Sequence, residues 1–227
     1  MAEKKESGLQ LFVDFDGTVT QRDIGDTIFT TFIPADILDG GWHDRIIADW
    51  KSGILSSEQC LIEECGKLVT TEEELKTELA RHELTAGFVE LANYCGECDI
   101  PLTILSDGMD FYIDFILANH GLSNIPFRSN HMHFENGNII LEFPYKDKGC
   151  GRCGNCKRWH IDSMRTDGHH VIYAGDGYSD RFAIRDADVV FAKDDLAAYC
   201  GENGHDFLPF DNFFTIIHYL ERIYGNV

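Results

Sequence analysis

LQLFVDFDGT, residues 9–18, joins an apolar run to an acidic turn and decides the fold class of this chain. The run from Leu9 to Phe15 is apolar and compatible with a strand, as in the buried strands of parallel sheets. It ends in the turn Asp16-Gly17-Thr18. Ligands gather beyond the carboxyl ends of parallel strands, so functional side chains are expected first at this turn.

The rest of the chain alternates between strands and helices. Strands are expected at residues 101–105, 171–174 and 188–191. The helices are expected at residues 87–98, 110–120, after Cys156, from about Ser179, at 194–200 and at 213–224. Strands separated by helices predict right-handed crossovers and therefore an α/β fold with a parallel, Rossmann-like sheet.

Two segments depart from this alternation. Between residues 26 and 82, apolar residues recur at helical spacing, which predicts a bundle of four or five helices. Residues 131–143 alternate on both sides of Asn136-Gly137, which predicts a β-hairpin flap followed by a cysteine-rich loop. We therefore expect a core of residues 1–20 and 86–227, which includes the flap and loop at 127–156, and a separate helical part at 21–85.

Composition and charge narrow the function classes. The 227 residues carry a net charge of −20, which disfavours nucleic acid and anionic membranes as partners. No stretch approaches the ~18 uninterrupted apolar residues of a membrane helix. The N-terminus is charged and lacks the apolar block of a secretion signal, so a cytoplasmic protein is expected.

The candidate catalytic and binding residues lie at three strand ends and at the start of one helix. They deliver carboxylates, a hydroxyl and an amine to one sheet edge: Asp14, Asp16, Ser106, Asp107, Lys157, Asp176 and Asp180. Crowded carboxylates repel one another, and a Mg²⁺ ion, which prefers oxygen ligands, would relieve this. An aspartate could then attack a phosphate held by lysine, while a second carboxylate transfers protons.

The same residues resemble a known family. Asp14-Phe15-Asp16-Gly17-Thr18, Ser106, Lys157 and Gly175-Asp176-Gly177-Tyr178-Ser179-Asp180 are similar, in order, to the four motifs of haloacid dehalogenase (HAD) phosphatases. The resemblance implies Asp14 as nucleophile and Asp16 as general acid and base. It implies Thr18, Ser106 and Lys157 as phosphate binders. It also implies Mg²⁺ on Asp14, the Asp16 carbonyl and Asp176, with Asp180 in support.

Within this family the chain resembles the phosphoserine-phosphatase-like branch, whose helical cap is inserted where residues 21–85 stand. It looks closest to the methionine-salvage phosphatases acting on 2-hydroxy-3-keto-5-methylthiopentenyl-1-phosphate. However, Ser106-Asp107-Gly108 replaces their usual Ser-Gly-Gly and instead looks like the phosphoethanolamine and phosphocholine phosphatases. Asp107 could hold a substrate ammonium group, together with Asp23 or Asp26, so an amine-bearing substrate is the alternative.

Cys150, Cys153 and Cys156 have the spacing of zinc ligands. A structural zinc site needs a fourth ligand, and the candidates are His131, His133, His160, Cys95 and Cys98. Reduced thiols or a disulfide are the alternatives. Cys95 and Cys98 themselves are expected to pack inside the protein.

These observations predict a phosphatase for a small phosphorylated metabolite. Dehalogenation or phosphoryl transfer on the same scaffold is one rival, and Asp176 with Asp180 argues against the metal-free dehalogenases. The other rival is a non-catalytic, zinc-clipped interaction module. The sequence leaves the oligomeric state open.

Overall fold

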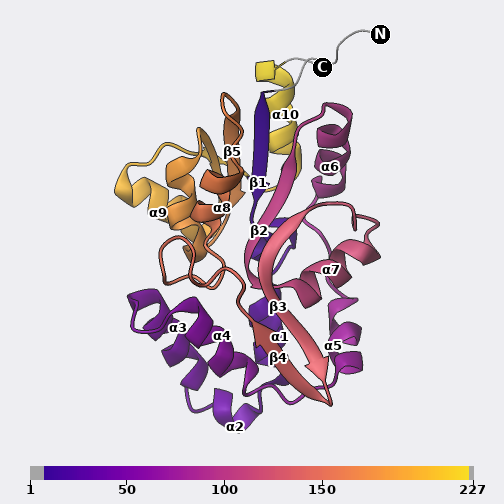
Figure 1. Cartoon of the computed structure of the whole chain (residues 1–227), viewed down its shortest axis with the longest axis vertical. Helices are drawn as coiled ribbons and strands as arrows, with labels where there is room; N and C mark the ends of the chain where they lie inside the picture. Colours follow the sequence, from indigo (N-terminus) through magenta and orange to yellow (C-terminus); the bar gives the residue numbers. More distant parts are fainter. Residues whose placement is uncertain (1–7, 225–227) are drawn as a thin grey trace.

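The computed structural model describes residues 8–224, which contain a seven-stranded sheet in the order β4-β3-β2-β1-β5-β6-β7 (Figure 1). The strands are β1 (Leu9–Val13), β2 (Leu102–Met109), β3 (Phe127–Glu135), β4 (Asn138–Glu142), β5 (His170–Gly175), β6 (Val189–Ala192) and β7 (Leu208–Pro209). All neighbouring strands are parallel except β3 and β4. The expected α/β fold with a parallel sheet is confirmed.

Strand β1 lies at the centre of the sheet. All five of its residues are buried, as an apolar strand covered on both faces should be. The chain runs from β1 to β2 and β3 on one side, and β5, β6 and β7 lie on the other. This change of direction opens a crevice at the carboxyl end of β1, where Asp14 follows.

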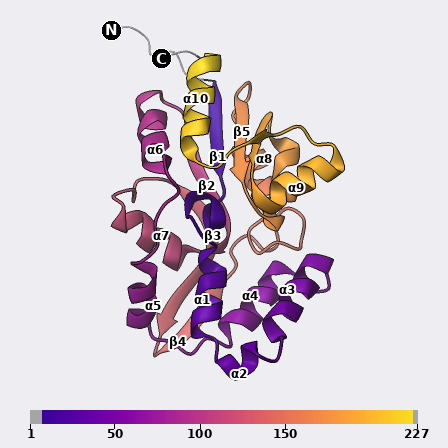
Figure 2. The same cartoon turned by 180° about the vertical axis from the view of Figure 1, so that it is seen from behind.

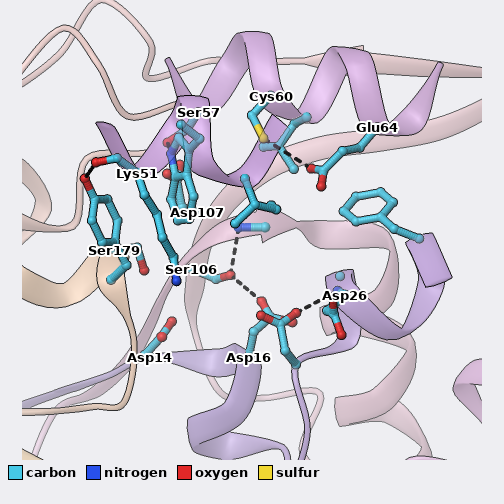
Figure 3. Close-up of a pocket in the computed structure, with 18 of the residues that line it drawn as sticks. Asp14, Asp16, Asp26, Lys51, Ser57, Cys60, Glu64, Ser106, Asp107 and Ser179 are labelled. Carbon is cyan, nitrogen blue, oxygen red and sulfur yellow. Dashed lines mark hydrogen bonds between the residues drawn. The ribbon is translucent and has the colours of Figure 1, made fainter. Parts of the chain in front are cut away.

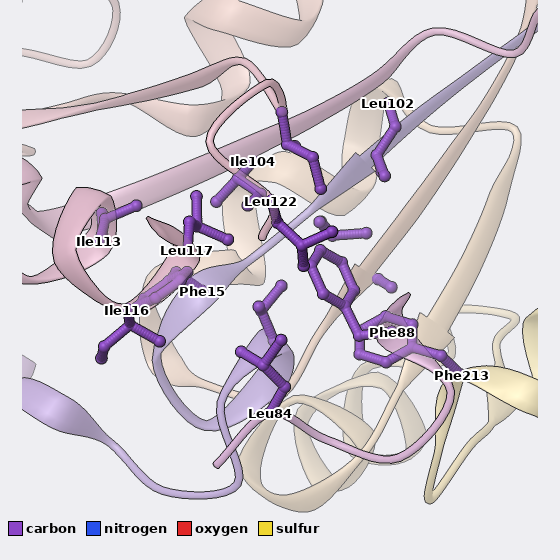
Figure 4. Close-up of a cluster of buried hydrophobic side chains, with 14 of the residues drawn as sticks. Phe15, Leu84, Phe88, Leu102, Ile104, Ile113, Ile116, Leu117, Leu122 and Phe213 are labelled. Atoms are coloured by element: carbon purple, nitrogen blue, oxygen red, sulfur yellow. The ribbon is translucent and has the colours of Figure 1, made fainter. Parts of the chain in front are cut away.

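Helices cover both faces of the sheet. Leu11 and Val13 of β1 belong to one apolar cluster and Phe12 to another, because strand side chains alternate between faces. The first cluster includes residues of α6 (Phe88–Glu97), α7 (Asp110–Asn119) and α10 (Phe213–Tyr224), and Figure 4 shows part of it. The second includes residues of α8 (Lys157–Met164), a 3₁₀-helix (Tyr178–Asp186) and α9 (Asp194–Asn203).

The segment between β1 and α6 is helical, as its apolar spacing predicts. It contains α1 (Ile24–Phe32), α2 (Ala35–Leu38), α3 (Trp42–Ser52), α4 (Ser57–Cys65) and α5 (Glu72–Leu79). The two ends of this segment lie side by side where they join the rest of the chain. The N–H of Thr85 donates to the carbonyl of Val19 at 2.8 Å, and Thr20 forms an antiparallel β-bridge with Leu84. These helices lie at the end of the molecule opposite the termini (Figures 1 and 2).

The hairpin predicted at residues 131–143 is present, but it is not separate from the sheet. The first part of β3 pairs parallel to β2, and only residues 131–135 pair antiparallel with β4. Asn136 and Gly137 both have positive φ, 51° and 79°, as a two-residue hairpin turn requires. The core part of β3 was not predicted, because Ser129 and Asn130 are polar although they are buried.

Other boundaries differ modestly from the expectations. Strand β2 continues past Leu105 to Met109, so Ser106 and Asp107 lie within its end. The helix expected from Ser179 is a 3₁₀-helix. The two-residue strand β7 was not expected, because so short an element leaves no periodicity to detect.

Replacing the buried Phe213 tests the packing of α10 on the sheet. Phe213 is fully buried and its ring centroid lies 5.0 Å from that of Phe88, whereas its neighbour Phe214 is 40% exposed. We expect Phe213→Ala to lower the free energy of unfolding in urea by roughly 3–5 kcal/mol. The matched Phe214→Ala should lower it by roughly 1 kcal/mol or less. Equal losses would contradict this packing.

Candidate active site

The turn after β1 approaches the loop after β5 closely enough to bring acidic side chains together. Gly17 has a φ of +72°, and a Cβ at this position would lie 2.5 Å from Oδ2 of Asp176. A residue with a side chain would therefore push the two loops apart. The hydroxyl of Thr18, a predicted phosphate binder, donates to Oδ1 of Asp176 at 2.6 Å.

Lys157 is the buried cation at the centre of this acidic group. It is the first residue of α8 and only 3% exposed. Its Nζ lies 2.6 Å from Oδ1 of both Asp14 and Asp180 and donates to Oγ of Ser179 at 2.9 Å. Burial alone would lower the pKa of Lys157, but Asp14 and Asp180 outweigh it and raise the pKa. The amine therefore stays charged at neutral pH.

The carboxylates around Lys157 are poorly solvated and repel one another. Burial raises the pKa of Asp14 well above its usual range, Asp180 adds to the rise and Lys157 opposes it. Burial and the neighbouring Asp180 also raise the pKa of Asp176 to about 7. Additional positive charge nearby would stabilise the ionised form of both carboxylates.

Asp180 differs from the other two because both of its carboxylate oxygens already accept two hydrogen bonds. Its Oδ1 accepts from Lys157 and from the hydroxyl of Tyr173 at 2.5 Å. Its Oδ2 accepts from the backbone N–H groups of Asp176 at 3.1 Å and Gly177 at 2.9 Å. Asp180 thus fixes the loop after β5 and the position of the lysine.

The donor set suits a hard divalent cation. One oxygen from each of Asp14, Asp176 and Asp180 lies within 4.8 Å of the others. Mg²⁺ prefers oxygen ligands and is commonly held by a few carboxylates together with water and substrate phosphate. The raised pKa values of Asp14 and Asp176 reflect the charge crowding that such an ion relieves. The residues therefore fit Mg²⁺.

Asp16 points to a different set of donors. Its Oδ2 accepts from the hydroxyls of Ser106 at 3.1 Å and Tyr112 at 2.9 Å, and its Oδ1 from the N–H of Ile24 at 3.1 Å. Burial raises the pKa of Asp16, against the opposing effect of these hydrogen bonds. Tyr112 was not anticipated from the sequence, because an aromatic residue in the first turn of a helix is usually explained by packing alone.

Gly108 lies in close contact with these groups. A Cβ at this position would lie 1.6 Å from the hydroxyl oxygen of Tyr112 and 2.9 Å from Oδ2 of Asp16. Its N–H donates to Oγ of Ser106 at 2.9 Å. Glycine is thus required here by the spacing of the protein's own atoms.

Asp107 is held by groups of the protein on two sides. Its Oδ1 accepts from the backbone N–H of Asn155 at 2.7 Å, and the side chain of Ser57 of α4 helps to lower its pKa. Burial raises the pKa of Asp107, and these two groups lower it in part. The fully buried side chain of Asn155 donates to the carbonyls of Ser106 and Arg128 at 2.7 and 2.8 Å. The loop before Lys157 is thereby attached to the end of β2.

A cavity of about 360 Å³ lies between these residues and helices α1, α3 and α4. Figure 3 shows Asp14, Asp16 and Ser106 on one side of it and Ser57, Cys60 and Glu64 of α4 on the other. Its lining also includes Gly25, Tyr112, Asp195, and the three residues Asp107, Gly108 and Ser179 already described. Asp23 and Asp26 line it too, and Oδ1 of Asp23 accepts from the N–H of Asp26 at the start of α1.

The wall formed by α1, α3 and α4 combines apolar residues with polar ones, among them the buried Ser57 and Glu64. Its apolar and aromatic residues are Phe29, Ile47, Trp50 and Leu61. Nε2 of His43 lies 3.0 Å from Oε1 of the buried Glu64, and this hydrogen bond raises the pKa of His43. This wall is suited to contact the part of a ligand that is remote from the carboxylates.

Three contacts connect helix α3 with the sheet side of the cavity. The hydroxyl of Tyr178 donates to the carbonyl of Lys51, and the ring centroids of Trp50 and Tyr178 lie 4.9 Å apart. The Nζ of Lys51, also in the lining, is 3.6 Å from a carboxylate oxygen of Asp195. Lys51 and Tyr178 were not singled out from the sequence, because no motif marks a contact between such distant segments.

The three cysteines predicted as zinc ligands are close together in the loop before α8. Their sulfur atoms lie within 4.8 Å of one another, and all three thiols are free. Among the described residues, no fourth histidine, cysteine or carboxylate joins this group. Nε2 of His160 contacts Oδ1 of Asn155, while Cys95 and Cys98 are buried in the main apolar cluster, as expected.

Comparison with known proteins agrees with this geometry. The family model described as Putative Phosphatase matches residues 9–200. The chain is 29% identical to 2-hydroxy-3-keto-5-methylthiopentenyl-1-phosphate phosphatase of Bacillus cereus (strain G9842) over 223 residues, 95% of this chain and 97% of that protein. It is also 29% identical to the Bacillus thuringiensis subsp. konkukian (strain 97-27) protein of that name, over 92% and 94% of the two chains.

Solved structures share the fold. A phosphoserine phosphatase with an analogue of its phospho-aspartyl intermediate superposes with a TM-score of 0.69, at 18% identity, over 95% of this chain and 99% of that one. A substrate-bound phosphoserine phosphatase also gives a TM-score of 0.69, at 19% identity, over 96% of this chain and 99% of that one.

Among the helices of residues 8–224, none has the length and apolar character of a membrane-spanning helix.

The family model covers most of the chain, and the relatives with matching names align over nearly their whole length. The non-catalytic module considered from the cysteines is therefore not retained. This chain belongs to the Putative Phosphatase family, and it has the fold of the phosphoserine phosphatases.

Proposed function

We propose that the protein is a Mg²⁺-dependent phosphatase that hydrolyses a small phosphomonoester through a phosphorylated Asp14. The contact of Lys157 with Asp14 and Asp180, beside Asp176, is the observation that carries this proposal. It puts a carboxylate nucleophile, a fixed cation and a cation-binding group of oxygens at one point of an otherwise acidic protein.

Asp14, Asp176 and the backbone carbonyl of Asp16 would hold Mg²⁺. Asp180 would act mainly by positioning Lys157 and the loop of Asp176, because its oxygens already accept four hydrogen bonds. When bound, Mg²⁺ would neutralise charge on the phosphate and act as a Lewis acid. Thr18 would keep Asp176 in place through its hydrogen bond.

The first step transfers the phosphoryl group to the protein. A carboxylate oxygen of Asp14 attacks phosphorus, and the bond from phosphorus to the substrate oxygen breaks. Lys157 and Ser106 hold the phosphoryl oxygens. Asp16 donates its proton to the leaving oxygen, for which a raised pKa is suited because the acid must be protonated beforehand.

The second step returns Asp14 to its starting state. Asp16, now a carboxylate, takes a proton from a water molecule, and the oxygen of that water attacks phosphorus. The bond between phosphorus and Asp14 breaks, which releases inorganic phosphate. Tyr112 orients Asp16 in both steps through its hydrogen bond to Oδ2.

Residues 21–85 would form a cap that closes over the site. The contact of Tyr178 with Lys51, and the effect of Ser57 on the pKa of Asp107, support a closed position of the helices in this structure. Closure would exclude bulk water and present the wall formed by α1, α3 and α4 to the substrate. Lys51, beside the carboxylate end of the cavity, would add a second cation near the phosphate.

The substrate would be 2-hydroxy-3-keto-5-methylthiopentenyl-1-phosphate or a similar sugar-like phosphate. The names of the relatives point to this compound. Phe29, Ile47 and Leu61 offer an apolar surface for a methylthio group. Asp107 does not oppose this choice, because its Oδ1 is occupied by the N–H of Asn155.

An amine-bearing substrate such as phosphoethanolamine, phosphocholine or phosphoserine is the second candidate. The observation in its favour is that Asp23 and Asp26 line the cavity next to aromatic rings. Carboxylates and aromatic faces together attract ammonium groups. Asp26 is the better receptor, because Asp23 already accepts a hydrogen bond as the cap of α1.

Replacement of Asp14 tests the nucleophile. Asp14→Asn should reduce phosphate release by at least about a hundredfold, because an amide oxygen is a far weaker nucleophile than a carboxylate. The exposed Asp114→Asn is the control and should retain wild-type activity. Substantial activity of folded Asp14→Asn would contradict the assignment of Asp14 as the nucleophile.

Removal of Mg²⁺ with EDTA should abolish activity, and added Mg²⁺ should restore it.

Replacement of Gly108 tests the orientation of Asp16. In Gly108→Ala the new methyl group must displace the hydroxyl of Tyr112, so we expect kcat to fall at least about tenfold. Gly96→Ala, where a Cβ meets no atom within 4 Å, should leave kcat unchanged. Both variants should be compared by circular dichroism and steady-state kinetics. Unaltered kcat in Gly108→Ala would argue that this contact has no role in turnover.

A substrate panel distinguishes the two candidate classes. It should contain the methylthiopentenyl phosphate, other sugar phosphates, phosphoserine, phosphoethanolamine and phosphocholine, each assayed for phosphate release with Mg²⁺. We expect the highest kcat/KM for the first compound, with Asp26→Asn changing it less than threefold. Preference for amines, with KM raised about tenfold or more by Asp26→Asn, would favour the second candidate instead.

A further inference from the structure

The thiols of Cys150, Cys153 and Cys156 form a compact group outside the catalytic cavity. Their sulfur atoms are mutually within 4.8 Å, and those of Cys150 and Cys153 are 3.4 Å apart. Zinc–thiolate bonds of about 2.3 Å in tetrahedral geometry put sulfur atoms about 3.8 Å apart. A disulfide would require about 2.05 Å. The observed spacing is closer to that of a shared metal ion.

The backbone of the loop lies close to the sulfur of Cys156, the residue before α8. Gly149, with a φ of +69°, lets the loop fold back so closely that a Cβ there would lie 2.5 Å from the sulfur of Cys156. The loop is therefore shaped around this sulfur atom.

The group can be reached from solvent on one side. Cys150 is exposed, Cys153 is half-buried and Cys156 is buried. The buried candidate His160 is turned toward Asn155, and the described residues provide only the three thiols. A metal ion held here would complete its coordination with water or another external ligand.

We propose that Cys150, Cys153 and Cys156 bind one thiophilic cation such as Zn²⁺, at a site separate from the Mg²⁺-binding carboxylates. Soft thiolate ligands select such ions, whereas carboxylates select Mg²⁺. The two sites would therefore bind different ions in the same molecule.

The ion would stabilise the loop that carries the catalytic lysine. Lys157 directly follows Cys156, and Asn155, which lies between Cys153 and Cys156, donates its N–H to Asp107. The carbonyl of Arg152 accepts from the N–H of Ser57 at 2.9 Å, which connects the same loop to α4. Binding at the thiols would thus limit movement between the lysine, the end of β2 and the helical segment.

Cadmium binding to the full-length, reduced protein tests the site directly. After treatment with a chelator and with saturating Mg²⁺ present, Cd²⁺ should produce a thiolate-to-metal charge-transfer absorption that saturates at one equivalent. Zn²⁺ should compete it away. Cys150→Ser and Cys153→Ser should each weaken Cd²⁺ binding at least tenfold. Cys150 is exposed, so its replacement by serine should leave the fold intact.

Two controls separate this site from the others. Cys200→Ala removes a buried cysteine in the other apolar cluster and should keep the absorption. Asp14→Asn alters the carboxylate site and should also keep it, so failure of the proposed mechanism would not mimic failure of the thiol site.

Limited trypsin digestion gives a second readout that does not depend on spectroscopy. Lys148 and Arg152 are exposed cleavage points within the loop. One equivalent of Zn²⁺ should slow cleavage there at least several-fold in wild type and not in Cys150→Ser. The proposal is overturned if reduced protein shows no stoichiometric charge-transfer absorption, if binding survives both serine variants, or if mass spectrometry of freshly purified protein shows a disulfide among these cysteines.

Discussion

The ion pair between Lys157 and the carboxylates of Asp14 and Asp180 is the interaction around which the site is arranged. At about 4 Å and an effective dielectric constant near 20, two like charges repel by about 4 kcal/mol. Three clustered carboxylates would therefore be costly without a cation. The lysine offsets part of this repulsion, and its nearly complete burial requires the two aspartates to stay in place. The rest of the charge imbalance makes the site receptive to a divalent ion.

This constraint explains why several elements meet at one point. The turn after β1 needs Gly17 to reach Asp176, and the loop after β5 is closed by the hydrogen bonds of Asp180. Helix α8 must begin at the sheet edge for its first residue to lie between the aspartates. Asn155 holds that beginning against the end of β2. The loop that contains the three cysteines is thus part of the support of the catalytic edge.

The chain separates the chemical and selective parts of the cavity. The residues from strand ends supply carboxylates, a hydroxyl and an amine, and these suit a phosphate whatever it is attached to. The residues from α1, α3 and α4 supply apolar side chains and the buried pair of His43 and Glu64. Under the proposed function, reaction type and substrate choice could therefore vary independently on one architecture, as in relatives and fold neighbours named for different substrates.

Much of this could be predicted from the sequence, because the decisive signals are local. The apolar run from Leu9 to Phe15 predicted a buried strand, the alternation of strands and helices predicted a parallel sheet, and apolar spacing predicted the helical segment. Parallel strands place their carboxyl ends at one edge, so the meeting of Asp14, Ser106 and Asp176 followed from the fold class. Tertiary structure alone decided which atoms face each other: that Tyr112 donates to Asp16, that Asp107 is occupied by Asn155, and that Thr18 supports Asp176. These contacts join residues from separate elements. Their geometry depends on how the whole chain packs, and the spacing of residues in the sequence does not determine that packing.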